Sequence, residues 1–240
     1  MKNLLAAATV LLSLSASAQV PALMYHQVTA LKPTGYTVIE PEKFTRHLDA
    51  IKEAGYTTIT VSEALSGREL PPRAVIITFD DGWADNVNAA LELRRRGMSA
   101  TFNVLSGKFG HPEYLTKAQV AWLAQHPYFE VGSHTHTHFI KWKHNLDGLT
   151  EHTVMQELLE SKEQLEELTN RPVTTLAWPY GFTTDTLEKL ATKAGYLSTQ
   201  HVVNQVRKRS TVVERLNVDG RCTAADVLEM LSTLQHKECK

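Results

Sequence analysis

The chain has 240 residues, with 25 Lys and Arg against 26 Asp and Glu, and its formal net charge is −1. A near-neutral chain without a basic block has no electrostatic footprint for nucleic acid or an anionic membrane, and it favours a neutral substrate over a polyanion. Cys222 and Cys239 are its only cysteines; they make no disulfide framework and resemble no metal knuckle, although they can pair in an oxidising compartment.

The first 18 residues have the three parts of a secretory signal peptide. Lys2 supplies the positive start, an apolar run covers residues 4–14, and Ala16-Ser17-Ala18 has the small residues of a cleavage site. The run is too short for a stop-transfer helix, and no later stretch is apolar enough to cross a bilayer. We therefore expect an exported protein, periplasmic or secreted, that begins at Gln19 without membrane insertion; the alternative is a buried N-terminal helix.

Strands and helices alternate along the rest of the chain, without a Ser/Gly-rich linker or an internal repeat. The patterns predict strands at 21–26, 56–61, 74–79, 100–105, 129–132, 174–177 and 212–218, a loop at 27–36, and helices at 41–54, 86–96, 115–125, 151–168, 184–194 and 223–234. This alternation is typical of a parallel sheet wrapped by helices. We predict one α/β domain over residues 19–240, with about seven parallel strands in a closed or nearly closed barrel.

Polar residues follow several of these predicted strands. His26, Asp80-Asp81 and the residues after Gly132 and Ala177 all occupy strand ends. Functional residues of such barrels lie at the C-terminal ends of the strands, so we expect these segments to meet at one rim.

Two adjacent carboxylates end the apolar strand Ile76-Ile77-Thr78-Phe79 and precede Gly82 and Trp83. Adjacent side chains of an extended segment point in different directions, so Asp80 and Asp81 can hold different partners, one a water and the other a metal. By themselves, Asp-Asp-Gly residues also fit a polar turn that only closes a strand.

Three histidines fall within five residues after the strand that ends at Gly132, in Ser-His-Thr-His-Thr-His. Two imidazoles and one carboxylate form a ligand set that leaves open positions for water and substrate on a catalytic divalent metal. His134 and His136 share a face if the segment stays extended, whereas His134 and His138 converge if it turns.

Three motifs in order, Thr-Phe-Asp-Asp-Gly, Ser-His-Thr-x-Thr-His and Trp-Pro-Tyr-Gly, resemble those of the NodB-type polysaccharide deacetylases, a carbohydrate esterase family with a distorted (β/α) barrel. They span about residues 74–181. The resemblance implies that Asp80 is the catalytic base, that Asp81, His134 and His138 bind the metal, and that the backbone N–H of Tyr180 donates to the oxyanion. His136 is then a neighbour of the metal site. The implied ion is divalent, zinc first, with cobalt, nickel or iron as alternatives.

A histidine acid is also implied, because the leaving amine needs a proton. Many family members carry this acid in a Leu-x-His motif near the C-terminus, but neither His201 nor His236 stands in that pattern. Leu-Met-Tyr-His, ending at His26, resembles a permuted branch that includes the poly-β-1,6-N-acetylglucosamine deacetylases. His26 is therefore the predicted acid; the alternative is a structural histidine at the rim.

The chain also departs from the family. Many members have an arginine two residues before the motif proline, where this chain has Ala177. Arg215 is a possible substitute that would orient Asp80. The alternative for Arg215 is a surface position or an ordinary ion pair. The remaining predicted substrate contacts are Trp83, Trp178, Pro179 and Gly181. Four aromatic side chains could either stack on sugar rings or belong to the core: Trp83, Trp178, Tyr180 and Trp142.

We expect a metal-dependent hydrolase that removes N-acetyl groups from N-acetylglucosamine units of an extracellular or cell-wall polysaccharide or oligosaccharide. Two alternatives stay open: an O-acetyl esterase acting on xylan or a similar glycan, and a carbohydrate-binding barrel without turnover.

Overall fold

The computed structural model describes residues 20–31, 36–140, 148–202 and 211–239. The predicted signal peptide and Trp142 lie outside the described residues. No helix within these ranges is long and apolar enough to cross a membrane.

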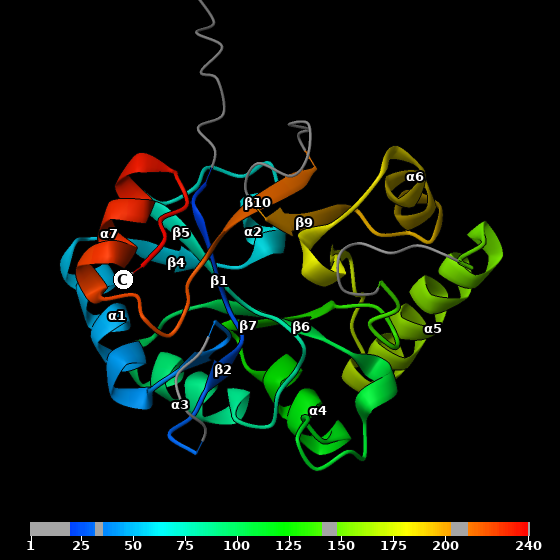
Figure 1. The fold of residues 1–240 in the computed structure, drawn as a ribbon, viewed down its shortest axis with the longest axis horizontal. Coiled ribbons are helices and arrows are strands. Elements are labelled where there is room, and N and C mark those ends of the chain that lie inside the picture. Colours follow the sequence, from blue (N-terminus) through cyan, green and yellow to red (C-terminus); the bar gives the residue numbers. More distant parts are fainter. Residues whose placement is uncertain (1–19, 32–35, 141–147, 203–210, 240) are drawn as a thin grey trace, which may run out of the picture.

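Seven parallel strands form a closed barrel surrounded by helices, which confirms the predicted distorted (β/α) barrel (Figure 1). Around the barrel, the order is β1, β10, β9, β8, β7, β6 and β5, and β5 pairs again with β1. Their bounds are β1 Ala22–Tyr25, β5 Ala74–Phe79, β6 Ala100–Val104, β7 Phe129–Ser133, β8 Thr175–Ala177, β9 Ser198–Val202 and β10 Val212–Asn217.

Helices follow most strands and cover the outside of the barrel. In Figure 1, α1 and α7 lie together on one side, α3 and α4 lie below, and α5 and α6 close the other side. Among the described residues, the helices are α1 Pro41–Glu53, α2 Val61–Ala64, α3 Asn86–Arg96, α4 Lys117–Gln125, α5 Glu151–Thr169, α6 Asp185–Lys193 and α7 Ala224–Thr233. The 3-10 turns in these ranges are η1 Ser106–Lys108 and η3 Pro179–Gly181.

Local signals explain where these helices begin and end. Pro41 occupies the first turn of α1, where its missing N–H costs nothing. The Thr223 side chain accepts from the backbone N–H of Asp226 and so caps α7. Gly97 ends α3 with a φ of 66°, a left-handed conformation that suits a residue without Cβ.

The strand count is confirmed, but β9 was not among the predicted strands. Its sequence, Ser-Thr-Gln-His-Val, lacks an apolar pattern because its buried side chains bind other polar groups inside the protein. The predicted strand at 56–61 is β4 (Thr57–Ile59), which pairs only with the first half of β5 among the described residues. The predicted loop at 27–36 begins with β2 (Gln27–Val28), which pairs with β3 (Val38–Ile39).

Side chains alternate along the strands, so some point outward into the hydrophobic core under the helices and others point into the barrel. Tyr25 and Phe79 point outward and pack against each other and against Phe44 of α1, with ring centroids 5.4 to 5.8 Å apart. Asp80, the residue after Phe79, therefore points the other way, into the barrel, where it meets Arg215 of β10. The outer face of the strands thus stabilises the fold, while the inner face carries polar side chains toward the rim.

Candidate active site

The β5 strand delivers Asp80 and Asp81 to the rim in two different directions. Asp80 continues the pairing with β1 through its N–H, which donates to the Tyr25 carbonyl at 3.0 Å. Asp81 has a left-handed backbone with a φ of 72°, and so has Gly82. A Cβ at Gly82 would lie 3.1 Å from the Val104 side chain, so the turn needs glycine. This turn separates the two carboxylates as the sequence predicted.

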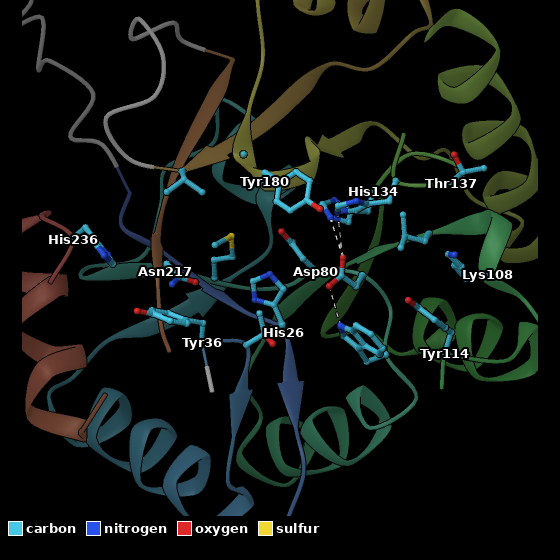
Figure 2. Close-up of a pocket in the computed structure, with 18 residues that line it drawn as sticks. His26, Tyr36, Asp80, Lys108, Tyr114, His134, Thr137, Tyr180, Asn217 and His236 are labelled. Carbon is cyan, nitrogen blue, oxygen red and sulfur yellow. Dashed lines mark hydrogen bonds and ion pairs between the residues drawn. The ribbon is translucent and has the colours of Figure 1, made fainter. Parts of the chain in front are cut away.

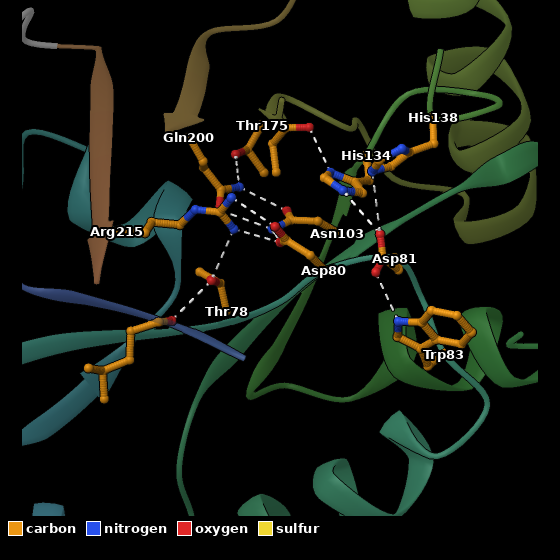
Figure 3. Close-up of polar contacts among 12 residues, drawn as sticks. Thr78, Asp80, Asp81, Trp83, Asn103, His134, His138, Thr175, Gln200 and Arg215 are labelled. Carbon is orange, nitrogen blue, oxygen red and sulfur yellow. Dashed lines mark hydrogen bonds and ion pairs between the residues drawn. The ribbon is translucent and has the colours of Figure 1, made fainter. Parts of the chain in front are cut away.

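Asp81, His134 and His138 form a cluster of three ligand atoms that lie within 4.8 Å of one another (Figure 3). The Oδ1 atom of Asp81 is 3.3 Å from Nε2 of His134 and 3.8 Å from Nε2 of His138. The other carboxylate oxygen of Asp81 accepts a hydrogen bond from the Trp83 indole at 2.9 Å. One carboxylate and two imidazoles around a small space fit a divalent metal such as zinc.

A turn in the histidine segment brings the imidazoles of His134 and His138, and not that of His136, to Asp81. Thr135 and His138 have left-handed backbones, with φ of 71° and 65°, and the ring centroids of His134 and His138 lie 5.2 Å apart. His136 points elsewhere: its Nδ1 lies 2.8 Å from the Ser106 hydroxyl, and its Nε2 lies 3.6 Å from Glu160. The turned conformation, and not the extended one, is therefore present.

A hydrogen bond to the backbone also fixes the orientation of the His134 ring. Its Nδ1 lies 2.8 Å from the backbone carbonyl of Ala177. Because a carbonyl only accepts, Nδ1 must carry a proton, and Nε2, which faces Asp81, is the ring nitrogen left to bind a metal. Burial lowers the pKa of His138 to about 4, helped by the charge of His134, and a neutral imidazole is the form that binds a metal.

We predict that His138→Ala weakens zinc binding by at least about 100-fold, because it removes a ligand. His136→Ala is the matched control, since it removes an imidazole of the same segment that contacts Ser106 and Glu160 instead. Competition with a chromogenic zinc chelator measures both dissociation constants. Equal losses in the two variants would contradict this assignment of the ligands.

Asp80 is held by a buried arginine and an amide (Figure 3). The two Arg215 Nη atoms donate to the two Asp80 oxygens at 2.6 and 2.8 Å, and Asn103 donates to Oδ1 at 2.8 Å. Burial raises the pKa of Asp80, but the adjacent Arg215 guanidinium outweighs it, and the pKa falls to about 2. Asp80 is thus a fixed, ionised carboxylate, and Arg215 takes the orienting position for which the sequence offered it as a substitute.

A second layer of polar side chains fixes Asn103 beneath Asp80. Gln200 donates to Asn103 at 2.8 Å and to Thr175 at 2.9 Å, and Asn103 donates back to Gln200 at 3.1 Å. Gly132 leaves room for this network, because a Cβ there would lie 2.5 Å from the Asn103 amide oxygen. Asn103 and Gln200 were not among the site residues predicted from the sequence; polar side chains inside otherwise buried strands were the available signal.

Comparison with known proteins identifies this arrangement. A sequence model described as polysaccharide deacetylase matches residues 67–198, more than half of the chain. The chain belongs to the polysaccharide deacetylase family. YxkH of Bacillus subtilis (strain 168) is 32% identical over 185 residues, which cover 75% of this chain and 63% of that protein, so the match spans less than two thirds of the relative's length.

Two solved structures share the fold of this polysaccharide deacetylase domain. The Streptococcus pyogenes deacetylase PplD, solved in complex with acetate, is 25% identical with a TM-score of 0.79, over 89% of this chain and 98% of that one. IcaB from Ammonifex degensii is 22% identical with a TM-score of 0.76, over 89% and 96% of the two chains. The likeness to IcaB concerns the fold, and it is consistent with the permuted branch of the family.

The family motifs surround a cavity of about 760 Å³ (Figure 2). Both motif aspartates and the two clustered histidines, His134 and His138, line it, together with His26, Trp83, Tyr180 and Gly181. Tyr180 packs edge-on against His138, with ring centroids 4.8 Å apart, and its backbone has a φ of 58°. The Nδ1 atom of His26 is buried without a hydrogen-bond partner among the described residues. The predicted rim of functional side chains is therefore one continuous site.

Two predicted substrate contacts of the polysaccharide deacetylase motif lie outside this cavity. Trp178 is fully buried, and its indole N–H donates to Glu188 at 2.7 Å. Glu188 also lies 3.2 Å from the buried His201, which explains that histidine as a structural one. Pro179 is buried too. The stacking of Trp178 on a sugar is therefore a wrong prediction, because the indole N–H has its partner in the core.

Proposed function

We propose that the protein is a metal-dependent hydrolase that removes N-acetyl groups from N-acetylglucosamine units of an extracellular or cell-wall polysaccharide. One observation carries the proposal: the three-ligand cluster of Asp81, His134 and His138 and the fixed carboxylate of Asp80 line the same cavity. A decayed carbohydrate-binding barrel would have no reason to keep both. Zinc is the first candidate ion for two imidazoles and one carboxylate.

The protein side chains divide the hydrolytic work. Asp81, His134 and His138 would hold a divalent ion, which would supply Lewis-acid chemistry for the acetyl carbonyl and the attacking water. Asp80 accepts the proton of that water, while Arg215 and Asn103 hold the carboxylate in one orientation. Because Asp80 and Asp81 face different partners, proton transfer and metal binding do not compete for the same oxygen atoms.

Two further groups complete the reaction. The backbone N–H of Tyr180 stabilises the negative oxygen of the tetrahedral intermediate, as the family resemblance implies. His26 gives a proton to the leaving amine. Its place in the cavity beside both aspartates supports this role, as does the ring nitrogen that is buried without a hydrogen-bond partner among the described residues.

We further propose that the protein acts outside the cytoplasm, after cleavage of the predicted signal peptide. The disulfide between Cys222 and Cys239 supports this location, because disulfides form and persist in oxidising compartments.

Acetate release from N-acetylglucosamine oligomers tests the function. We expect release by the metal-loaded protein, a loss of at least about 100-fold after EDTA treatment, and recovery when zinc is restored. An O-acetylated xylan serves as the competing substrate. Activity that survives full removal of the metal would contradict the metal role, and release from the acetyl ester alone would contradict the N-acetyl assignment.

A further inference from the structure

Three side chains that the proposed reaction does not use gather at one end of the cavity. Tyr36, Asn217 and His236 lie on the far side of His26 from Lys108 and Tyr114 (Figure 2). They come from the segment before β3, the end of β10 and the tail after α7. We call these three residues the outer subsite.

The barrel itself places Asn217. It lies two residues after Arg215 on β10, so both side chains point to the same face of the strand. Its Cα pairs across the sheet with Met24, two residues before His26. Its side-chain amide has no hydrogen-bond partner in the described ranges of the chain and lines the cavity. Asn217 thus carries an unused donor and acceptor beside the predicted acid.

A covalent and an ionic contact hold His236 at the cavity. Leu234 ends α7 in a left-handed conformation with a φ of 56°, which turns the chain back. Lys237 then binds Asp226 of α7 at 2.7 Å, and Cys239 forms the disulfide with Cys222 in the loop after β10. The tail is therefore fixed on both sides of His236, whose imidazole lines the same wall as Asn217.

The loop after β10 also supports Tyr36. The Arg221 guanidinium lies 4.9 Å from the centre of the Tyr36 ring, and Asp219 binds Arg221 at 2.7 Å. Tyr36 is 71% exposed, which leaves much of the residue open to a ligand. Asp219 and Arg221 neutralise each other, so the charge beside the outer subsite is balanced.

We propose that the outer subsite binds a second, neutral sugar unit of the substrate, next to the unit that is deacetylated. An exposed aromatic ring offers a surface for a pyranose face, and the amide and imidazole offer hydrogen bonds to hydroxyl or acetamido groups. The disulfide keeps the histidine in place for this contact. The inference rests on the proposed function, and it makes the C-terminal tail a determinant of substrate length.

The test compares an N-acetylglucosamine tetramer with the single sugar, using the zinc-loaded, disulfide-bonded protein. For the wild type, we expect a higher kcat/KM for the tetramer than for the single sugar. His236→Ala and Asn217→Ala each reduce the tetramer-to-monomer ratio of kcat/KM by about three- to tenfold, the loss of one hydrogen bond, mainly through a higher KM. Gln235→Ala is the matched control on the tail, because Gln235 is exposed and does not line the cavity.

A double variant, Cys222→Ser with Cys239→Ser, tests the tether. We expect the same loss of the ratio, and little further loss when His236→Ala is added, because both changes remove the same contact. Since the double variant is the one most exposed to misfolding, the single variants His236→Ala and Asn217→Ala decide the subsite. A wild-type ratio in both His236→Ala and Asn217→Ala would overturn the proposal, as would an equal fall for both substrates.

Failure of the proposed function can be told apart from failure of the outer subsite. If the wild type releases no acetate from any oligomer, titration calorimetry with the same tetramer and single sugar replaces the kinetics. Tighter binding of the tetramer that is lost in His236→Ala supports the outer subsite without hydrolysis. Equal affinity for the tetramer and the single sugar, or no binding of either, overturns the outer subsite.

Discussion

Asp80→Asn is expected to lower kcat/KM for acetate release by about 10²- to 10⁴-fold, because it removes the group that accepts the proton of the attacking water. The asparagine keeps one oxygen that can accept from Arg215 or Asn103, which in the native protein donate at 2.6 and 2.8 Å. We therefore expect a folded variant of reduced stability. Its zinc content should equal that of the wild type, because Asp80 is not among the three ligands.

Asp81→Asn provides the matched comparison for that variant. It changes the neighbouring carboxylate in the same way, but Asp81 lies 3.3 Å from Nε2 of His134 and belongs to the ligand cluster. We expect loss of both zinc and activity. Zinc content by atomic emission and acetate release separate the two roles. An Asp80→Asn variant that keeps more than about a tenth of the activity, or loses its zinc, would contradict the division between base and ligand.

Arg215→Met is expected to lower the free energy of unfolding by about 3–5 kcal/mol, since it leaves the buried carboxylate of Asp80 without its partner. For a domain of this size, the melting temperature should fall by about 6–20 °C. Urea denaturation followed by circular dichroism measures the change. Arg215→Lys should be intermediate, because a single ammonium cannot reproduce the two parallel hydrogen bonds.

Two controls isolate the buried pair. Combining Arg215→Met with Asp80→Asn should cost less than the sum of the two single changes, because the double variant leaves no unpaired charge. Arg96→Met removes a partly exposed arginine that binds Asp49 at 2.8 Å and Glu92 at 2.6 Å, and it should cost about 1 kcal/mol or less. Similar losses for Arg215→Met and Arg96→Met would contradict the importance of the buried pair.

The sequence alone placed the main residues of the site at one rim. His26, Asp80, Asp81 and the histidine segment each follow a strand, and the C-terminal ends of parallel strands meet at the same edge. The cavity brings them together as expected. Their chemical roles remain predictions, which the variants above test.

Polar groups inside the barrel escaped sequence analysis. β9 has no apolar alternation, because Gln200 binds Asn103 and Thr175 and Thr199 binds Glu188. A hydrophobic pattern detects burial among apolar groups, whereas these side chains are buried because they satisfy one another. Trp178 shows the reverse error: an aromatic residue in a site motif turned out to belong to the core.

Local sequence patterns were thus sufficient to predict the barrel, the ends of its strands and the pair of aspartates, because periodicity and motifs are properties of neighbouring residues. Only the tertiary structure decided which histidines converge, through left-handed residues at Thr135 and His138. Only the tertiary structure joined Arg215 to Asp80, 135 positions apart, because β10 and β5 both pair with β1. Such contacts depend on strand register in three dimensions, and sequence spacing carries no record of it.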